Sequence, residues 1–341
     1  MVRFGITVPK IYDPSSRDPY AKTFELCQMA EDLGYDFCSV GHHSFTPDGG
    51  TESAPFVFLA ALATRTSTIR LVTGIYLLPL HHPAAVAEQL ATLDVISNGR
   101  AVMGVGVGYR DYEFDAFGVD IHQRGARMNE AMTAIRSAFT EGRWNHAGKF
   151  WTLKDLPLQP TPIQNNGPPM WVGGSSDAAI KRAATLGDGW MSDNMINIDG
   201  EAERADFYRN ACKAAGREVG EVCILRTAWI SATRKEAEDA VMPSMRAYLA
   251  HYTGANAGSG TLPWESDLMQ RIARQEHVPV EEFTRGQALA GTPDDVIAEL
   301  EGWRDKVRPD SIELMITGPG DYDSLKRMIS LFGKDVLPQF S

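Results

Sequence analysis

The sequence predicts an α/β protein, a (β/α)8 TIM barrel with insertions, on three observations. Residues 69–108 hold two short apolar runs separated by one helical pattern, which is the arrangement of a βαβ unit. Further apolar runs alternate with helical patterns along the chain. The length of 341 residues suits one such barrel with additional segments. In this fold, ligands bind on the loops that follow the strands.

The βαβ unit can be argued residue by residue. The run at residues 69–78 is short and rich in apolar and β-branched side chains, as expected of a strand buried on both faces. A helix begins at Pro83, because proline is favoured at the first helical position, and it ends at Gly99. The next buried run, residues 101–107, follows within two residues.

The same reasoning gives eight strands and eight helices in alternation. We expect the strands at residues 3–8, 37–40, 69–77, 101–107, 170–173, 189–191, 222–230 and 311–316. We expect the helices at residues 21–33, 55–66, 84–96, 125–141, 177–186, 201–215, 234–251 and 293–306.

Two segments exceed a minimal barrel, although the whole of residues 1–341 is interpreted as a single domain. Residues 144–169 carry five prolines and little periodicity, so they are expected to form a long ordered loop. Residues 252–291 contain the stretch GANAGSG followed by a polar helical pattern. This insertion between the seventh and eighth strands is either a mobile lid over the site or a plain surface insertion.

Composition excludes several classes of partner. The chain has 33 basic and 44 acidic residues, a net charge of −11, so neither nucleic acid nor an anionic membrane surface is an expected partner. No secretory leader or apolar run of membrane-spanning length is visible. The four cysteines are widely spaced and form no CxxC pair, which favours reduced, buried thiols. We therefore expect a soluble cytoplasmic protein.

Two adjacent histidines, His42 and His43, directly follow the second strand. Neighbouring side chains at a strand end point in opposite directions, so at most one ring should face the barrel axis. A histidine there can hydrogen-bond a cofactor or substrate, or act as a general base near neutral pH. The alternatives are a metal ligand, which needs further converging ligands, and a purely structural histidine.

A glycine-rich run, residues 104–108, follows the fourth strand. It does not match the dinucleotide fingerprint GxGxxG, because Tyr109 and Asp111 stand where glycine is required and no helix is expected promptly afterwards. The Walker A pattern is also absent. Glycines at a strand end instead allow a flat ring to lie close to the backbone, or simply ease packing.

The fifth and sixth strands each end in a candidate ligand contact. Residues 170–177 run from a strand through a Gly-Gly turn into a helix N-terminus, where free N–H groups and the helix dipole favour an anion such as phosphate. Ser175 or Ser176 is also suited to cap that helix. Trp190, in the sixth strand, is either a wall of a cofactor pocket or a core residue.

Taken together, these residues resemble the bacterial luciferase-like family of flavin-dependent monooxygenases. The resemblance covers most of the chain, and its specificity comes from the order and spacing of its motifs. These are Gly5-Ile6-Thr7, Ala30-Glu31-x-x-Gly34-Tyr35-Asp36, His42-His43-x-Phe45, Leu59-Ala60-Ala61-Leu62-Ala63, Leu78-Pro79-x-x-His82-Pro83, Leu93-Asp94-x-x-Ser97-x-Gly99-Arg100, Gly104-Val105-Gly106, Val172-Gly173-Gly174-Ser175 and Gly187-Asp188-Gly189-Trp190.

The resemblance implies reduced FMN, usually supplied by a separate flavin reductase, bound at the strand ends of the barrel. Oxygen then adds to the flavin, and the resulting peroxide oxygenates a small or medium organic substrate. His42 matches the catalytic histidine of the family, and His43 matches the second histidine of its EHH motif. The cofactor-binding positions implied are Gly74 and Ile75, joined by a non-prolyl cis peptide beneath the flavin ring, with Gly106, Val107, Arg110, Val172, Gly173, Gly174, Ser175 and Trp190.

Two departures from the family pattern concern charge. Gly41 replaces the acidic residue of EHH, so any role of that carboxylate is lost or moved. Val107 stands where luciferase has an arginine for the flavin phosphate, and Arg110 is the nearest replacement, reaching either the phosphate or the substrate.

Two other functions remain open on the same barrel. One is an oxidoreductase that transfers hydride with the deazaflavin F420. The absence of an Asp-His pair after the second strand, and of a basic track for the F420 polyglutamate tail, favours FMN instead. The other is a catalytically silent flavin-binding protein. The resemblance also implies a homodimer, in which the second and third helices commonly form the interface, and no metal site is expected.

Overall fold

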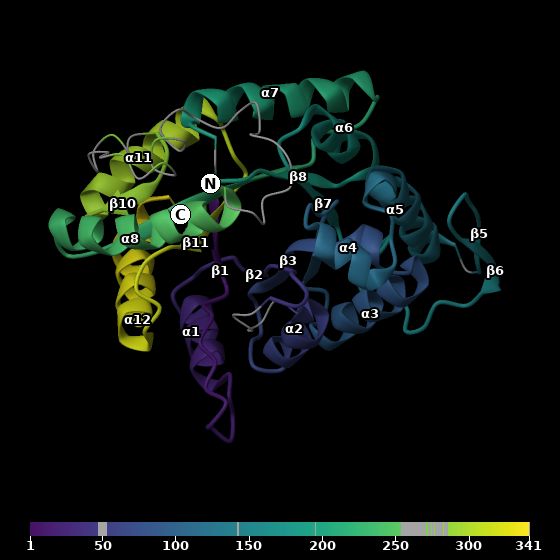
Figure 1. Cartoon of the computed structure of the whole chain (residues 1–341), viewed down its shortest axis with the longest axis horizontal. Helices are drawn as coiled ribbons and strands as arrows, with labels where there is room; N and C mark the ends of the chain where they lie inside the picture. Colours follow the sequence, from purple (N-terminus) through teal and green to yellow (C-terminus); the bar gives the residue numbers. More distant parts are fainter. Residues whose placement is uncertain are drawn as a thin grey trace. The chain divides into compact units, whose positions relative to one another are not determined.

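A computed structural model describes residues 1–46, 53–141, 143–194, 196–253 and 286–340, together with Arg271, Arg274, Glu276 and Glu282. The chain divides into two compact units (Figure 1). Unit 1 comprises Met1–Phe37, Met191–Asn210 and Glu221–Ser341, and unit 2 comprises Cys38–Trp190 and Ala211–Gly220.

The strands of unit 1 are β1 (Arg3–Thr7), β9 (Glu221–Ile230), β10 (Leu289–Gly291) and β11 (Ser311–Ile316), parallel and in the order β10-β9-β11-β1. In register, Arg3 lies opposite Ser311, and Ser311 lies opposite Cys223. The helices are α1 (Ala21–Asp32), α7 (Ile198–Ala214, which continues into unit 2), α8 (Arg234–Thr253), α11 (Pro293–Lys306), α12 (Tyr322–Leu331), the π-helical turn η4 (Phe332–Val336) and the 3₁₀ turn η5 (Leu337–Gln339).

Unit 1 contains a fully buried ion pair. Arg226 of β9 donates from Nη2 to Glu201 Oε2 of α7 at 2.7 Å, and neither side chain is exposed. The guanidinium also lies over the Trp303 ring of α11, 4.4 Å from its centroid, and donates to the carbonyls of Asp193 and Ile196. A buried arginine needs such partners, since an unpaired charge is costly there. The pair therefore ties the loop after residue 191 to the strand.

The strands of unit 2 are β2 (Phe37–Val40), β3 (Arg70–Leu77), β4 (Ala101–Gly106), β7 (Met170–Gly173) and β8 (Gly189–Met191), in the order β2-β3-β4-β7-β8. β3 pairs parallel to β4 and β4 parallel to β7. Its helices are α2 (Pro55–Ala63), α3 (Pro83–Ile96), α4 (Asp111–Phe117), α5 (Arg124–Thr140) and α6 (Asp177–Leu186), with the short turns η2 (Leu78–Leu80) and η3 (Ile121–Gln123).

Local chemistry explains where these helices begin and end. α3 begins at Pro83 because the His82 ring accepts the Ala84 N–H, and α11 begins with a capping box between Thr292 and Asp295. α2 ends at Ala63, earlier than predicted. The guanidinium of Arg100 accounts for this, since it donates to the carbonyls of Ala63 and Thr66 beyond the last turn.

Each predicted strand and helix is present, with ends shifted by a few residues, but among the described residues five further helices and strands were not predicted. α4 begins at Asp111, directly after the glycine run, so the expectation of no prompt helix there was wrong. α12 and the three-residue β10 were also not predicted. Residues 144–169, expected to be a loop, contain the antiparallel hairpin of β5 (Trp144–Ala147) and β6 (Thr152–Leu156).

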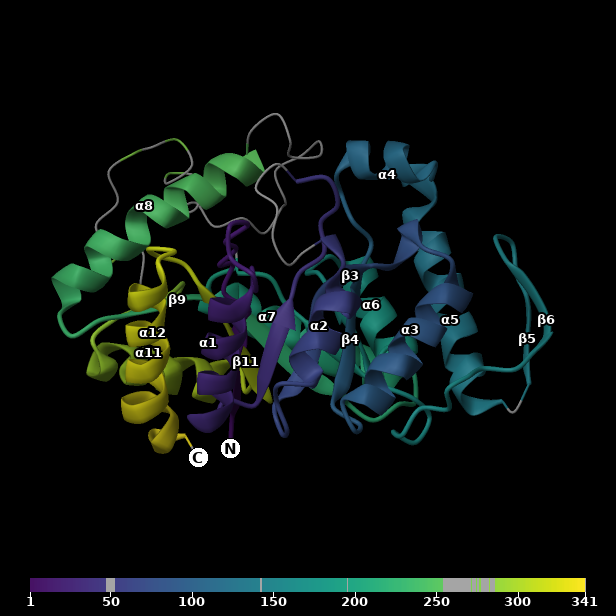
Figure 2. The ribbon, with the colours of Figure 1, turned by 90° about the horizontal axis from the view of Figure 1, so that it is seen from below.

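The hairpin depends on a contact that is distant in sequence. The Glu130 carboxylate of α5 accepts the backbone N–H groups of Lys149, Phe150 and Trp151, at 2.9–3.1 Å. The Arg127 guanidinium lies over the Trp151 ring, 4.8 Å from its centroid. Figure 2 shows β5 and β6 beside α5. Periodicity in residues 144–169 alone does not contain this information.

Most of the predicted insertion, residues 252–291, lies outside the described residues; its last part forms β10. Across the helices that the structure does describe, none combines the length and apolar character needed to span a membrane. All four cysteines are buried and free, as expected of reduced thiols.

Candidate active site at the strand ends of unit 2

The ends of β3, β4 and β7 meet around the side chain of Ile75. The pairing of β3 with β4 changes register between Thr73 and Tyr76, and the Gly74–Ile75 peptide between them is cis, as the resemblance implies. Gly74 and Ile75 are partly exposed in a strand that is otherwise mostly buried. This backbone is therefore available to a ligand at the strand ends.

Two of the predicted glycines make room for Ile75. A Cβ atom at Gly106 would lie 1.7 Å from Ile75 Cδ1, and one at Gly173 would lie 2.7 Å from Ile75 Cγ2. Both distances are too short for real contacts, so any larger residue would displace Ile75. For Gly106, this contact favours the interpretation that the glycine eases packing over the interpretation that it lets a flat ring lie close to the backbone. Val107, the next residue, is partly exposed.

Trp190 hydrogen-bonds to the turn that follows β7. Its indole Nε1–H donates to the Gly174 carbonyl at 2.8 Å, and the ring is fully buried. The geometry therefore favours Trp190 as a core residue over Trp190 as a wall of a cofactor pocket. Its hydrogen bond positions the turn. Gly174 has φ +114°, a conformation that favours glycine, and the Ser176 hydroxyl accepts the Ala179 N–H to cap α6. Ser175 and Val172 are buried beside it.

His42 is buried and its hydrogen bonding is defined. The backbone N–H of Leu77, at the end of β3, donates to His42 Nδ1 at 3.2 Å. Nδ1 must therefore be unprotonated, which leaves the ring proton on Nε2. Burial, with smaller contributions from His81 and His43, lowers the pKa of His42 from 6.5 to about 3. Near neutral pH, His42 is a neutral hydrogen-bond donor through Nε2.

His42 belongs to an aromatic cluster formed by His42, Phe56, Tyr76, His81 and Phe117. The His42 ring stacks on Tyr76 and on His81, at centroid distances of 4.6 and 5.2 Å. Phe56 packs on Tyr76 at 4.7 Å, and Phe117 meets His81 edge-on at 5.2 Å. Burial lowers the pKa of His81 from 6.5 to about 4 and raises that of Tyr76. These five rings form an uncharged cluster near neutral pH.

His43 has a different partner. Its Nδ1 lies 3.3 Å from Oε1 of Glu113, a residue of α4 whose side chain is fully buried. The sequence analysis did not identify Glu113, Tyr76 or His81. Nothing in the local sequence marks Glu113 as a site residue, because only the packing of α4 brings it to the loop after β2.

Arg110 lies directly before α4 and is 4% exposed. Its Nη1 donates to Tyr112 Oη at 2.9 Å, and its guanidinium lies over the Tyr109 ring, 5.6 Å from the centroid. Two phenol rings therefore orient this cation beside the end of β4.

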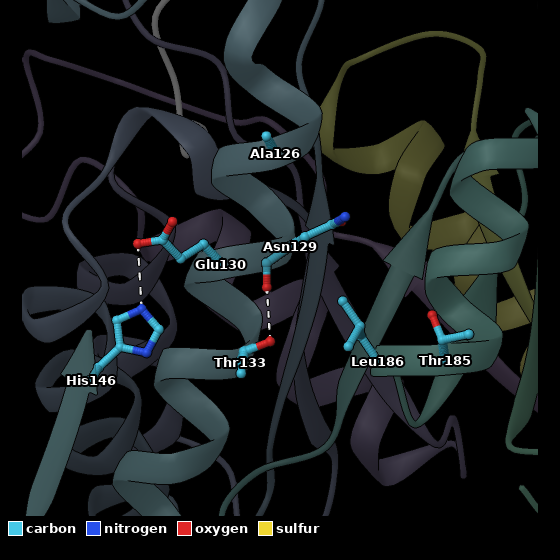
Figure 3. Close-up of a pocket in the computed structure, with 7 residues that line it drawn as sticks. All are labelled: Ala126, Asn129, Glu130, Thr133, His146, Thr185 and Leu186. Carbon is cyan, nitrogen blue, oxygen red and sulfur yellow. Dashed lines mark hydrogen bonds and ion pairs between the residues drawn. The ribbon is translucent and has the colours of Figure 1, made fainter. Parts of the chain in front are cut away.

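A depression of about 580 Å³ lies elsewhere on unit 2 (Figure 3). It is lined by Ala126, Asn129, Glu130, Thr133, His146, Thr185 and Leu186. The Glu130 carboxylate faces His146 there, but it already holds the hairpin. None of these residues is a predicted site residue, so we place the candidate active site at the strand ends instead. Within the described part of the chain, no three His, Cys, Asp or Glu side chains converge as a metal site would require.

Comparisons with known proteins agree with this fold. The family model for luciferase-like monooxygenases matches residues 2–307, and the chain belongs to this family. It is 27% identical to the oxygenase component of a flavin-dependent trigonelline monooxygenase from Acinetobacter baylyi, over 94% of this chain and 90% of that protein. It is 28% identical to an F420-dependent glucose-6-phosphate dehydrogenase from Kineococcus radiotolerans, over 93% and 92%.

Among solved structures, the chain is similar to the monooxygenase RslO1 from Streptomyces bottropensis, with a TM-score of 0.81, 26% identity and full coverage of both chains. The predicted fold class, a (β/α)8 barrel with insertions, is thereby confirmed. Its relatives include both flavin-dependent and F420-dependent oxidoreductases.

Proposed function

We propose that this protein is a flavin-dependent monooxygenase that uses reduced FMN and oxygen to oxygenate a small or medium organic substrate. The observation that carries the proposal is the meeting of three strand ends around Ile75, which leaves the Gly74–Ile75 backbone partly exposed beside the turn at Gly173–Ser176. Similarity to an oxygenase component supports a separate flavin reductase as partner. A homodimer is proposed on the family resemblance.

The residues at the strand ends fit a flavin. The Gly74–Ile75 backbone offers a narrow surface for a flat ring, and the turn before α6 offers N–H groups and a helix N-terminus for a phosphate. Arg110, which directly precedes α4, is the cation that we propose for the phosphate or the substrate. Reduced FMN, when bound, supplies the electrons and activates oxygen. His42 is buried and keeps its proton on Nε2, where it is available to donate to the bound group.

One alternative, F420-dependent hydride transfer, is favoured by the similarity to an F420-dependent dehydrogenase at comparable identity. Two features favour FMN. Gly41 stands before His42 where an aspartate would be expected, and the chain carries a net charge of −11, which gives a polyglutamate tail little attraction. A catalytically silent flavin-binding protein is the other outcome of the test.

The test is to titrate the purified protein with reduced FMN and with reduced F420 without oxygen, and then to admit oxygen. We expect tight binding of reduced FMN, followed by a transient absorbance change that depends on oxygen. Tight binding of F420 with no oxygen-dependent transient would replace the proposal with hydride transfer. Binding of FMN with no transient and no turnover would identify a silent binder.

A pair of glycine variants tests the proposed location of the flavin site. Gly173→Ala pushes a Cβ into Ile75 and is expected to weaken FMN binding at least about tenfold, since the backbone that carries the ring must move. Gly320→Ala is the matched control, because a Cβ there meets no atom within 4 Å. Equal affinities in the two variants would move the flavin away from β7.

A further inference from the structure

A buried carboxylate from α4 faces the loop that carries the two histidines. Glu113 Oε1 accepts the Ser44 backbone N–H at 2.7 Å and lies 3.3 Å from His43 Nδ1. Its second oxygen, Oε2, is buried and has no hydrogen-bond partner among the described residues. Burying a carboxylate to this degree destabilises the fold unless hydrogen bonds compensate for its lost hydration.

The end of β3 positions both histidines. The Leu77 N–H donates to His42, while the Leu77 side chain packs with Leu80 and with Phe114 of α4. Phe114 directly follows Glu113, so its packing fixes the turn of helix that presents the carboxylate. In Figure 2, α4 lies above β3 and β4. The placement of Glu113 is therefore set by core packing and not by a loose surface contact.

These contacts give the two adjacent rings opposite proton positions. His42 Nδ1 accepts a backbone N–H, so its proton is on Nε2. Glu113 Oε1 already acts as an acceptor toward Ser44, and His43 Nδ1 must then be the donor to it. In the neutral His43 ring, Nε2 is left with a free lone pair. The ring is partly exposed, with 16% of its side-chain surface accessible.

We infer that His43 is the proton acceptor of the site, that Glu113 is its positioning residue, and that His42 acts only as a donor. The carboxylate absent at Gly41 is thus supplied from α4. The catalytic consequence rests on the proposed function. In that step, an O–H or N–H bond of the reactant breaks and its proton moves to His43 Nε2. His43 keeps its Nδ1–H, which stays hydrogen-bonded to the Glu113 carboxylate.

The proton positions can be read without any cofactor or turnover. Histidine-selective ¹⁵N NMR of the purified protein distinguishes protonated from unprotonated ring nitrogens, and the variants His42→Gln and His43→Gln assign the two signals. At a pH where both rings are neutral, we expect Nε2–H for His42 and Nδ1–H for His43. The same proton on both rings, or Nε2–H at His43, would overturn the inference.

The role of Glu113 is tested with Glu113→Gln, which keeps an acceptor for Ser44 but removes the charge. We expect turnover to fall at least about tenfold. The pH profile of kcat/KM should change as well, because the protonated ring loses the carboxylate that it contacts. Tyr109, edge-on to His43 at 5.8 Å, is unchanged in this variant.

The control is Glu130→Gln, since Glu130 Oε1 lies at the same 3.3 Å from a histidine, but from Nε2 of His146 on the hairpin. It should leave the pH profile in place. An unchanged profile in Glu113→Gln would remove Glu113 from the mechanism. If the wild-type protein turns over with neither FMN nor F420, the proposed function fails, while the NMR result still decides the proton positions.

Discussion

The buried ring of His42 stacks on the partly buried ring of His81, with 5.2 Å between their centroids. Their surroundings keep both neutral, since burial lowers the pKa of His42 to about 3 and that of His81 to about 4. His81 Nε2 is buried without a hydrogen-bond partner among the described residues. Two charges side by side in this aromatic cluster would be strongly unfavourable, so His42 and His81 act through hydrogen bonds and not as cations.

Histidines of this kind make stability depend on pH in a defined direction. In the unfolded chain each binds a proton below about pH 6.5, whereas the folded protein keeps His81 neutral down to about pH 4. The unfolded state therefore takes up more protons in this window, and the stabilisation is lost as the pH falls. From about pH 7 to about pH 5, one such histidine lowers the free energy of unfolding by about 2 kcal/mol.

His81→Phe should reduce this loss by about that amount, because the phenyl ring keeps the stacking and cannot be protonated. Urea unfolding of wild type and variant at both pH values measures it. His122→Ala is the control, since His122 is exposed and its removal should leave the pH dependence unchanged. Parallel stability curves for wild type and His81→Phe would mean that the folded protein protonates His81 readily.

At the scale of elements, the site depends on how β3, β4 and β7 pack. Ile75 occupies the space that side chains at Gly106 and Gly173 would need. The register shift between Thr73 and Tyr76 brings the Gly74–Ile75 peptide out of the ladder with β4. The residue at position 75 and the two glycines therefore form one packing unit, and their substitutions should not be additive.

Gly106→Ala should lower the free energy of unfolding by about 1–3 kcal/mol, since the new Cβ lies 1.7 Å from Ile75 Cδ1 before relaxation. Adding Ile75→Ala should recover part of this loss, because it removes the colliding atom. Denaturant unfolding of the two single variants and the double variant measures the coupling. Additive effects in this cycle would show that Ile75 does not fill the space above Gly106.

α4 and the β5–β6 hairpin show which elements local sequence leaves undetermined. Asp111–Phe117 is a short helix, and its existence is tied to Phe114 packing against Leu77 and Leu80. The hairpin depends on Glu130, which lies outside it and accepts three of its N–H groups. The longer elements were predicted because their own periodicity encodes the buried face.

At the scale of the whole molecule, the interior holds all four thiols of the chain. Cys27, Cys38, Cys212 and Cys223 are buried and at most 1% exposed. A thiol reagent should therefore react with none of them rapidly in the folded protein and with four per chain after denaturation. Val57→Cys, at a residue that is 72% exposed, provides a rapidly reacting control. Fewer than four thiols in denaturant would reveal a disulfide.

The sequence by itself determined the alternation of strands and helices, the (β/α)8 class, and the place of His42 and His43 after the second strand. These follow from local periodicity, turn residues and motif spacing, which each segment carries within itself. Gly74–Ile75 was implied only by the family resemblance. Only the tertiary structure placed Glu113 against His43, filled the space beside Gly106 and Gly173 with Ile75, and put Trp190 beneath the turn at Gly174. Those contacts join residues far apart in the chain, and packing in three dimensions decides them.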